Sequence, residues 1–437
     1  MALGPRFLRL AAPLIGPGGV DAAITLKRDA EGLAALLPAR AWRALHPRLR
    51  VVGITGSCGK TTATGLIGAV LAEAGPVICS TRPWAASGAA ARLSQGANAR
   101  RPIGRLMLRA RGDTRFFVAE MGGGDAGGLR QFARHLRPDI AVVTHVRLDH
   151  RSRYRNHEAV AADKGRLIAA LPPEGLAILN ADDPHVAAMR RLTRARVIAC
   201  GRAEGADLRL LDASASLTEG LRLALSHDSR RITLATRFTS EIAVMPLMAA
   251  VAAGLAVGVA PARIRAVLEA AEPPPGRMRL HRLDSGIAVI DDSVKAPLYS
   301  VEQALDALAA AEAARKVAVI GTLSDLGSAT STKYRRVARQ ALAVADTVLF
   351  VGPWAGSVAR LKAEAGAGRL LTAETAAEAL AQLGPVLGPG ALVLLKGSNN
   401  ADHLERLLLA LSGQEVACDR IGCGRHHRCE DCALLAP

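Results

Sequence analysis

Short runs rich in Val and Ile recur along this chain, and longer segments separate them. The runs occupy residues 50–55, 116–120, 139–144, 175–180, 195–200, 286–291, 316–321, 346–352 and 391–396. Apolar residues follow a helical spacing between the runs, for example over residues 301–314, 333–345 and 401–412. Strands that alternate with helices form parallel sheets covered by helices, so we predict an α/β fold. Residues 205–240 alternate polar and apolar side chains instead, which predicts a small antiparallel insert.

The clearest domain boundary is a run of three prolines at 273–275, because Pro neither continues a helix nor fits a central strand. The length of 437 residues allows two or three domains with a large core. The expected parts are a short N-terminal segment at 1–48, a first α/β domain at 49–272, a second α/β domain at 276–412 and a Cys-rich tail at 413–437.

The chain is basic, with 56 Lys and Arg residues against 39 Asp and Glu residues and a net charge of +17. A basic surface favours anionic partners. No dense Lys/Arg block is present, and only 3% of the residues are aromatic. We therefore interpret the charge as diffuse surface charge and expect no nucleic-acid partner.

One segment, Ile242–Ala260, has nineteen residues without a charge and is long enough to cross a membrane. It contains seven Ala, one Pro and two Gly and has no aromatic belt, so a buried helix is the better prediction. Residues 1–20 lack a convincing cleavage site for a signal peptide. We expect a cytoplasmic protein without membrane insertion.

A Gly-rich turn follows the first Val/Ile run and leads into a Lys-Thr-Thr helix start, VVGITGSCGKTT at 51–62. Glycines let backbone N–H groups approach a phosphate, and the helix N-terminus adds its positive end. In such a loop Lys60 neutralises phosphate oxygens and Thr61 offers a hydroxyl to Mg²⁺. The full P-loop pattern is not met, because Ile54 stands where its first Gly belongs. The residues expected to bind the nucleotide here are Gly56, Ser57, Cys58, Gly59, Lys60, Thr61 and Thr62.

This loop resembles the nucleotide loop of the Mur ligase family, ATP-dependent ligases that join amino acids or peptides to a carboxylate. Eight further segments resemble family motifs and follow in the family's order. They are FVAEMGGGDAGG (117–128), THVRLDH (144–150), ADKG (162–165), LNADD (179–183), PGR (275–277), IDDS (290–293), GTLSDLG (321–327) and KGS (396–398). The last three are most similar to the ligases that add D-alanyl-D-alanine. The resemblance implies a P-loop central domain with a parallel sheet, followed by a Rossmann-like α/β C-terminal domain.

The resemblance also implies a reaction. ATP activates a carboxylate as an acyl phosphate, and an amine then displaces the phosphate. The partners are small-molecule or peptide carboxylates and amines, as in the synthesis of cell-wall peptide. By the same resemblance Mg²⁺ is held by Thr61, Glu120, His150 and Lys164, and Lys164 is carbamylated.

Further roles follow from the same resemblance. Asn180, Arg277 and Asp292 are expected to contact ATP, with Arg277 directly after the proline run. Lys60, His150 and Lys164 are expected to act in catalysis. Lys396 and Ser398 resemble positions near the incoming amine.

Other parts of the chain depart from the family pattern. Too few residues precede the loop for the family's uridine-nucleotide-binding domain. TRPWAASG (81–88), IAVMP (242–246) and DDSVKAP (291–297) stand where the family has Asn-containing segments. These changes favour a ligase for a non-uridine substrate, such as a polyamino acid. A P-loop kinase or regulatory nucleotide-binding protein is a second alternative, and a nucleic-acid-binding module is a third.

The tail has no counterpart in the family pattern. Its four cysteines are Cys418, Cys423, Cys429 and Cys432, with His426 and His427 among them. Four thiolates this close in sequence suit a tetrahedral metal site, and we predict zinc. An Fe–S cluster and a merely reduced tail are the alternatives.

Overall fold

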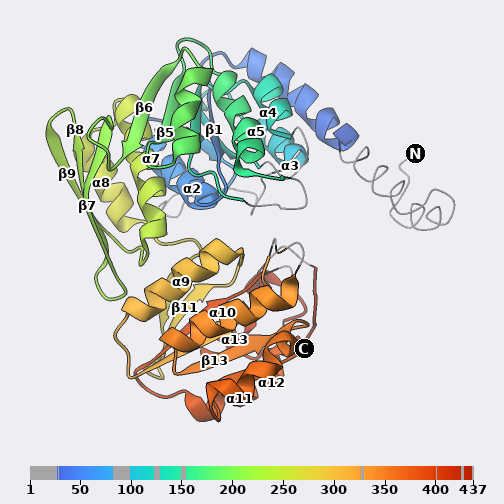
Figure 1. Cartoon of the computed structure of the whole chain (residues 1–437). Coiled ribbons are helices and arrows are strands. Elements are labelled where there is room, and N and C mark those ends of the chain that lie inside the picture. The colour runs from blue at the N-terminus through green and yellow to red at the C-terminus, as the bar shows by residue number, and fades with distance from the viewer. Residues whose placement is uncertain are drawn as a thin grey trace. The chain divides into compact units, whose positions relative to one another are not determined.

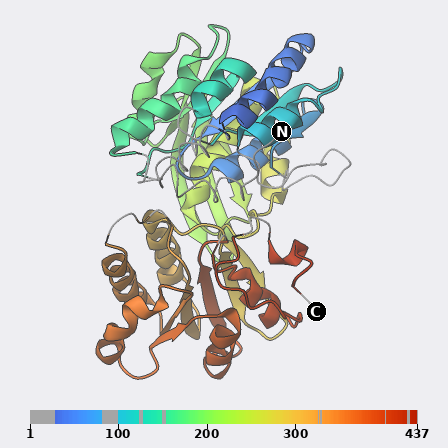
Figure 2. The same ribbon diagram turned by 90° about the vertical axis from the view of Figure 1, so that its right-hand side faces the viewer.

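The structure is a computed structural model that describes residues 27, 29–81, 99–122, 128–148, 154–324, 326, 329–399, 401–424 and 428–435 (Figures 1 and 2). The described chain forms two compact units. The first comprises the described residues up to Val146, with Glu158–Leu208 and Met248–Arg263. The second comprises the described residues of Arg147–His157, with Arg209–Leu247 and those from Ile264 onward.

One sheet has nine strands in the order β2-β3-β1-β4-β5-β6-β7-β8-β9 (Figure 1). Its strands are β1 (Arg50–Thr55), β2 (Val77–Cys79), β3 (Phe116–Glu120), β4 (Ile140–Val143), β5 (Leu176–Asn180), β6 (Arg196–Gly201), β7 (Leu208–Ser216), β8 (Gly220–His227) and β9 (Arg230–Thr236). The first six pair in parallel, whereas β8 and β9 are antiparallel. Every residue of β3, β4 and β5 is buried. Since successive side chains point to opposite faces, both faces of these strands are covered.

Helices separate the six parallel strands of this part of the chain, and further helices follow β9. They are α2 (Lys60–Leu71), α3 (Arg100–Met107), α4 (Gly128–Leu136), α5 (His157–Ala169), α6 (Pro184–Ala187), α7 (Val244–Ala256) and α8 (Pro261–Ala270), with short 3₁₀ helices η1 (Ala188–Leu192) and η2 (Glu241–Ala243). Residues 29–45 are also helical.

The second sheet has six strands in the order β10-β11-β15-β12-β13-β14. They are β10 (Arg279–Arg282), β11 (Ala288–Asp292), β12 (Arg315–Ile320), β13 (Thr347–Val351), β14 (Leu370–Ala373) and β15 (Ala391–Lys396). All neighbours are parallel except β10 and β11. The helices are α9 (Leu298–Ala310), α10 (Thr330–Val344), α11 (Lys362–Ala365), α12 (Ala376–Leu383) and α13 (Glu405–Leu411), with 3₁₀ helices η3 (Ala355–Leu361), η4 (Gly384–Val386) and η5 (Cys429–Asp431).

Alternate residues of the second sheet enter two separate cores. In β12, Ala318 and Ile320 pack with residues of α9 and α10, whereas Val317 and Val319 pack with residues of α12 and α13. This period of two is the geometry of a strand covered on both faces. The carboxyl ends of the parallel strands are therefore left for functional side chains.

The predicted α/β fold is confirmed. All nine predicted strands form, with bounds within two residues of those predicted. Residues 205–240 contain β7, β8 and β9, and the apolar segment Ile242–Ala260 contains α7, which is buried over most of its length. Within the described ranges, no helix is both long enough and apolar enough to span a membrane. The helix predicted over 401–412 begins only at Glu405, and β2, β10 and β14 were not predicted.

Candidate active site

The Gly-rich loop connects β1 to α2 at the carboxyl end of the parallel strands. Gly56 has a φ of 146°, and Gly59, the residue before α2, has a φ of 75°. A Cβ atom on Gly56 would lie 1.9 Å from Thr144 Oγ1. The sequence needs glycine at both positions, because the loop backbone is left-handed and is closely approached by the segment after β4.

That segment holds the loop through hydrogen bonds. Ser57 N–H donates to the His145 carbonyl (2.8 Å), and Thr144 Oγ1 donates to the Cys58 carbonyl (2.5 Å). Asn180, the last residue of β5, donates from Nδ2 to the Thr144 carbonyl (2.8 Å) and is buried. The Asn180 amide NH₂ therefore contacts the backbone that supports the loop, while its Oδ1 accepts from the Asp182 N–H (3.0 Å).

Lys60 is the first residue of α2. Its Nζ donates to the Gly56 carbonyl (2.7 Å) and lies 3.4 Å from the Ser57 carbonyl. The first turn of α2, which includes the half-buried Thr62, contains no acidic residue. The ammonium and the positive end of a twelve-residue helix thus meet at one loop, an arrangement that favours a bound anion.

Thr61 and Glu120 lie together beside the loop. Thr61 Oγ1 donates to Glu120 Oε2 (2.7 Å), and Glu120, the last residue of β3, is only 5% exposed. The Glu120 backbone N–H donates to Ser80 Oγ (2.8 Å), which fixes this strand end. A hydroxyl and a carboxylate are the oxygen ligands that Mg²⁺ prefers, so this pair fits the predicted magnesium site.

Of the other two predicted Mg²⁺ ligands, the structure describes only one. Lys164 lies on α5 and is 3% exposed, although lysine is rarely buried so fully. His150 lies outside the described residues.

Asp292 and Lys396 form a buried ion pair in the second unit. They are direct partners in the parallel register of β11 and β15, and Lys396 Nζ lies 2.5 Å from Asp292 Oδ2. Lys396 Nζ also donates to the Lys295 carbonyl (2.7 Å). Burial lowers the pKa of the Lys396 ammonium, Asp292 opposes this, and nearby Arg277 adds to the lowering.

Asp291, the preceding carboxylate, is fully buried and holds the turn before Arg277. Its Oδ2 accepts from the Gly276 N–H (3.0 Å), and its Oδ1 accepts from Ser293 Oγ (2.5 Å). Arg277 N–H donates to the Pro274 carbonyl (3.1 Å), so the residues after the proline run form a turn at the end of β11. Sequence reasoning singled out Asp292 and missed this role of Asp291.

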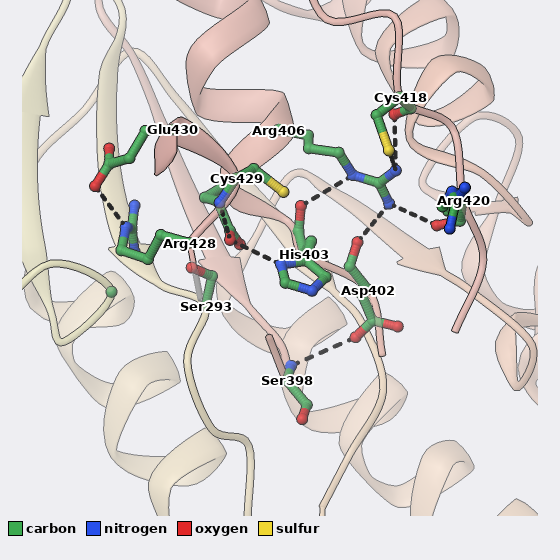
Figure 3. A network of polar contacts seen from close by, with 12 residues as sticks. Ser293, Ser398, Asp402, His403, Arg406, Cys418, Arg420, Arg428, Cys429 and Glu430 are labelled. Atoms are coloured by element: carbon green, nitrogen blue, oxygen red, sulfur yellow. Dashed lines mark hydrogen bonds and ion pairs between the residues drawn. The ribbon is translucent and has the colours of Figure 1, made fainter. Parts of the chain in front are cut away.

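The structure also gathers the tail cysteines. Cys418, Cys423, Cys429 and Cys432 line one pocket, together with His403 and Arg406. Figure 3 shows Cys418, Cys429, His403 and Arg406 from close by. His426 and His427 lie outside the described residues.

Asp402 is a buried carboxylate between two motif segments that the sequence analysis missed. It is 5% exposed, and its carboxylate accepts from Thr322 Oγ1 (2.5 Å) and the Ser398 N–H (3.4 Å). It thereby joins the GTLSDLG and KGS segments. The only sequence signal was its position four residues after Ser398.

Two family models match this chain: the Mur ligase middle domain over residues 54–254, and the Mur ligase, glutamate ligase domain over residues 276–399. The chain belongs to the Mur ligase family. This Mur ligase is an ATP-dependent enzyme that forms amide bonds, as the loop and the eight ordered segments predict.

Individual relatives agree with this assignment. The chain is 30% identical over 429 residues to the UDP-N-acetylmuramoyl-tripeptide--D-alanyl-D-alanine ligase of Mycobacterium bovis, covering 89% of this chain and 79% of the relative. A MurF crystal structure from Acinetobacter baumannii has a TM-score of 0.77 at 22% identity and covers 88% of this chain and 81% of that chain. The MurF ligase of Thermotoga maritima in complex with ADP gives a TM-score of 0.70 at 18% identity, covering 88% and 84%. These two structures show the shared fold.

The close approach of Thr144 to Gly56 gives a first prediction. Gly56→Ala should destabilise the Mur ligase by about 1–3 kcal/mol, because the new methyl group overpacks against Thr144. It should also weaken ATP binding. Gly205→Ala is the matched control, because nothing lies within 4 Å of its added methyl group. Denaturant unfolding and nucleotide titration of both variants test this, and equal behaviour of the two would contradict the loop geometry.

The buried pair gives a second prediction. Asp292→Ala should lower the free energy of unfolding by about 3–5 kcal/mol, because it leaves the Lys396 ammonium buried without its carboxylate. Asp292→Ala combined with Lys396→Met should recover most of this loss. The free energies of unfolding of Asp292→Ala, Lys396→Met and the double variant give the coupling between the two side chains. Additive effects would show that the two residues do not stabilise each other.

Proposed function

We propose that this Mur ligase transfers the γ-phosphoryl group of ATP to a peptide carboxylate and then joins that acyl group to an amine. The carboxylate oxygen attacks the γ-phosphorus, the bond to the β-phosphate oxygen breaks, and ADP leaves. The amine nitrogen then attacks the acyl carbon and loses a proton, the C–O bond breaks, and inorganic phosphate leaves. The observation that carries this proposal is the Thr61–Glu120 hydrogen bond beside the Lys60 end of α2.

Lys60 and the loop backbone bind the phosphates in this proposal. The Lys60 ammonium, held over the loop by the Gly56 carbonyl at 2.7 Å, exchanges that contact for phosphate oxygens. Two anions must meet in the first step, so cations have to shield them. Loop amides and the helix end add positive potential without another charged side chain.

Magnesium belongs to the same proposal. Thr61 and Glu120 hold it, with His150 and Lys164 as the further predicted ligands, Lys164 after carbamylation. When bound, Mg²⁺ neutralises negative charge on the phosphate oxygens. The burial of Lys164 supports a role other than that of a solvated lysine.

Arg277 and Asp292 are proposed to complete nucleotide binding. Asp291 fixes the turn that carries Arg277, and Lys396 fixes one oxygen of Asp292. Asn180 supports the loop through Thr144. Loop glycines, Cys58 and Thr62 complete the proposed nucleotide contacts.

The proposed substrates are those of cell-wall peptide synthesis. Relatives at up to 30% identity are named for adding D-alanyl-D-alanine to a UDP-N-acetylmuramoyl-tripeptide. We place the reaction in the cytoplasm, as predicted, where ATP is available. The zinc predicted for the tail takes no part in either step.

An amine panel tests the proposal. The full chain is given ATP, Mg²⁺, UDP-N-acetylmuramoyl-tripeptide and either D-alanyl-D-alanine or another amine, and ADP, phosphate and amide are measured. We expect equal amounts of all three with D-alanyl-D-alanine and none without an amine. Turnover only with a uridine-free carboxylate would overturn the proposed acyl substrate, and release of pyrophosphate would overturn the acyl-phosphate chemistry.

Removal of the loop cation gives a third prediction. Lys60→Ala should reduce turnover at least about 100-fold, the scale of removing one preorganised charge-stabilising group. Its thermal midpoint should stay close to that of the unchanged protein, because Lys60 is only partly buried and contacts loop carbonyls. Lys362→Ala, which removes an exposed lysine, is the control. Full activity of Lys60→Ala with unchanged ATP affinity would refute the loop's assigned role.

A further inference from the structure

The pocket that gathers the tail cysteines is separate from the ligase chemistry described above. Cys418, Cys423, Cys429 and Cys432 line it, together with His403, which lies just before α13, and Arg406, which lies on α13. Figure 3 shows His403, Arg406, Cys418 and Cys429. None of the four forms a disulfide within the described chain. Thiols from separate turns that line one small space are the donor set of a thiophilic metal.

The backbone holds these cysteines in place by local turns. Cys429 is the first residue of η5 and Cys432 directly follows this helix, and Cys432 N–H donates to the Cys429 carbonyl (2.9 Å). At the start of the tail, Cys418 N–H donates to the Leu435 carbonyl (3.3 Å), so the two ends of the tail lie together. The tail is too short to have a hydrophobic core of its own, and bound metal is the usual source of order in such segments.

His403 is the observation that points to a ligand. It is 2% exposed, its Nδ1 lies 2.9 Å from Glu405 Oε1, and within the described chain its buried Nε2 has no hydrogen-bond partner. Ligand atoms of His403, Glu405 and Cys429 lie within 4.8 Å of one another. A metal-ligating histidine usually has its second ring nitrogen on a carboxylate, and His403 lines the cysteine pocket with one ring nitrogen on Glu405 and the other without a hydrogen-bond partner in the described chain.

We propose that one zinc ion binds in this pocket, held by His403 Nε2 and by the thiolates of Cys418, Cys429 and Cys432. Glu405 does not line the pocket and orients His403 instead. This set revises the four-cysteine site predicted from the sequence, because the buried His403 Nε2 needs a partner and replaces Cys423. Zinc accepts such three-sulfur, one-nitrogen tetrahedral sites.

Charge supports the choice of Cys418. Zn²⁺ with three thiolates and a neutral imidazole carries one net negative charge. Arg406 is 4% exposed, and its Nη1 donates to the Cys418 carbonyl (2.8 Å) and lies 3.9 Å from Cys418 Sγ. A buried guanidinium beside the sulfur compensates the negative charge of the loaded site.

The loaded tail would also support the turn at Gly276. Arg428, next to Cys429, places Nη2 at 3.2 Å from Asp291 Oδ2, the oxygen that accepts the Gly276 N–H. Glu405 Oε1 accepts the Cys429 N–H (3.2 Å), so the same carboxylate contacts His403 and the tail backbone. Arg428 is thus a positioning residue that connects the metal-binding tail to Asp291.

Elemental analysis and cobalt substitution of the full chain test the site. We expect about one zinc per chain under the usual four-ligand stoichiometry, and less than about a tenth of that after Cys429→Ser with Cys432→Ser. Cys423→Ser in the same pocket and Cys79→Ser elsewhere are the matched controls and should keep the zinc. Glu405→Gln should weaken zinc binding about 10–100-fold, the usual effect of removing a carboxylate that orients a ligating histidine.

Native protein gives an answer even if a variant fails to fold. The Co²⁺-loaded chain should show tetrahedral d–d bands and charge-transfer absorption of three thiolates. A four-thiolate spectrum that survives His403→Asn would overturn the role of His403. Zinc-free protein with all thiols open to alkylation, or an iron–sulfur chromophore, would overturn the zinc site.

The link through Arg428 has its own readout. Arg428→Met should leave zinc content unchanged but speed hydrogen exchange at the Gly276 amide, and zinc removal should speed the same exchange. Unchanged exchange after zinc removal would refute the link while leaving the metal site intact.

Discussion

Parallel pairing of β1 with β3 on one side and β4 on the other is the constraint on which the candidate active site depends. The register places Glu120 opposite Ile54 and Val143 opposite Thr55. Because parallel strands end at one edge, Glu120, the Gly-rich loop and Thr144 come together there without any side chain having to reach far. The hydrophobic runs that form these strands therefore also set the geometry of the phosphate loop.

In the second unit, strand register likewise brings charged side chains together. The register of β11 and β15 puts Asp292 opposite Lys396, in a setting where neither charge is stable alone. Asp291, one residue earlier, points to the other face and gathers Gly276, Ser293 and Arg428. Two adjacent carboxylates thus serve two sides of one strand, one paired with Lys396 and the other holding the turn and the tail.

The local sequence pattern was enough to predict most of the strands, the Gly-rich loop and the family. It missed β2, β10 and β14, which have three or four residues each, and β10 reads Arg-Leu-His-Arg without an apolar run. It also missed Thr144, the Asp292–Lys396 pair and His403, because their roles depend on which strand lies beside which and on a tail folding back over α13. The tail cysteines were visible as a cluster, whereas the buried Nε2 of His403 becomes visible only in three dimensions.

Oxygen transfer from the carboxylate to phosphate tests the central claim most directly. The full chain would be given ATP, Mg²⁺, an amine and an acyl substrate whose carboxylate carries ¹⁸O, and the phosphate would be analysed by ³¹P NMR. The account predicts one labelled oxygen in each inorganic phosphate released, because the carboxylate oxygen stays with the phosphoryl group when the amide forms. Label in AMP, or unlabelled phosphate with full amide yield, would contradict it.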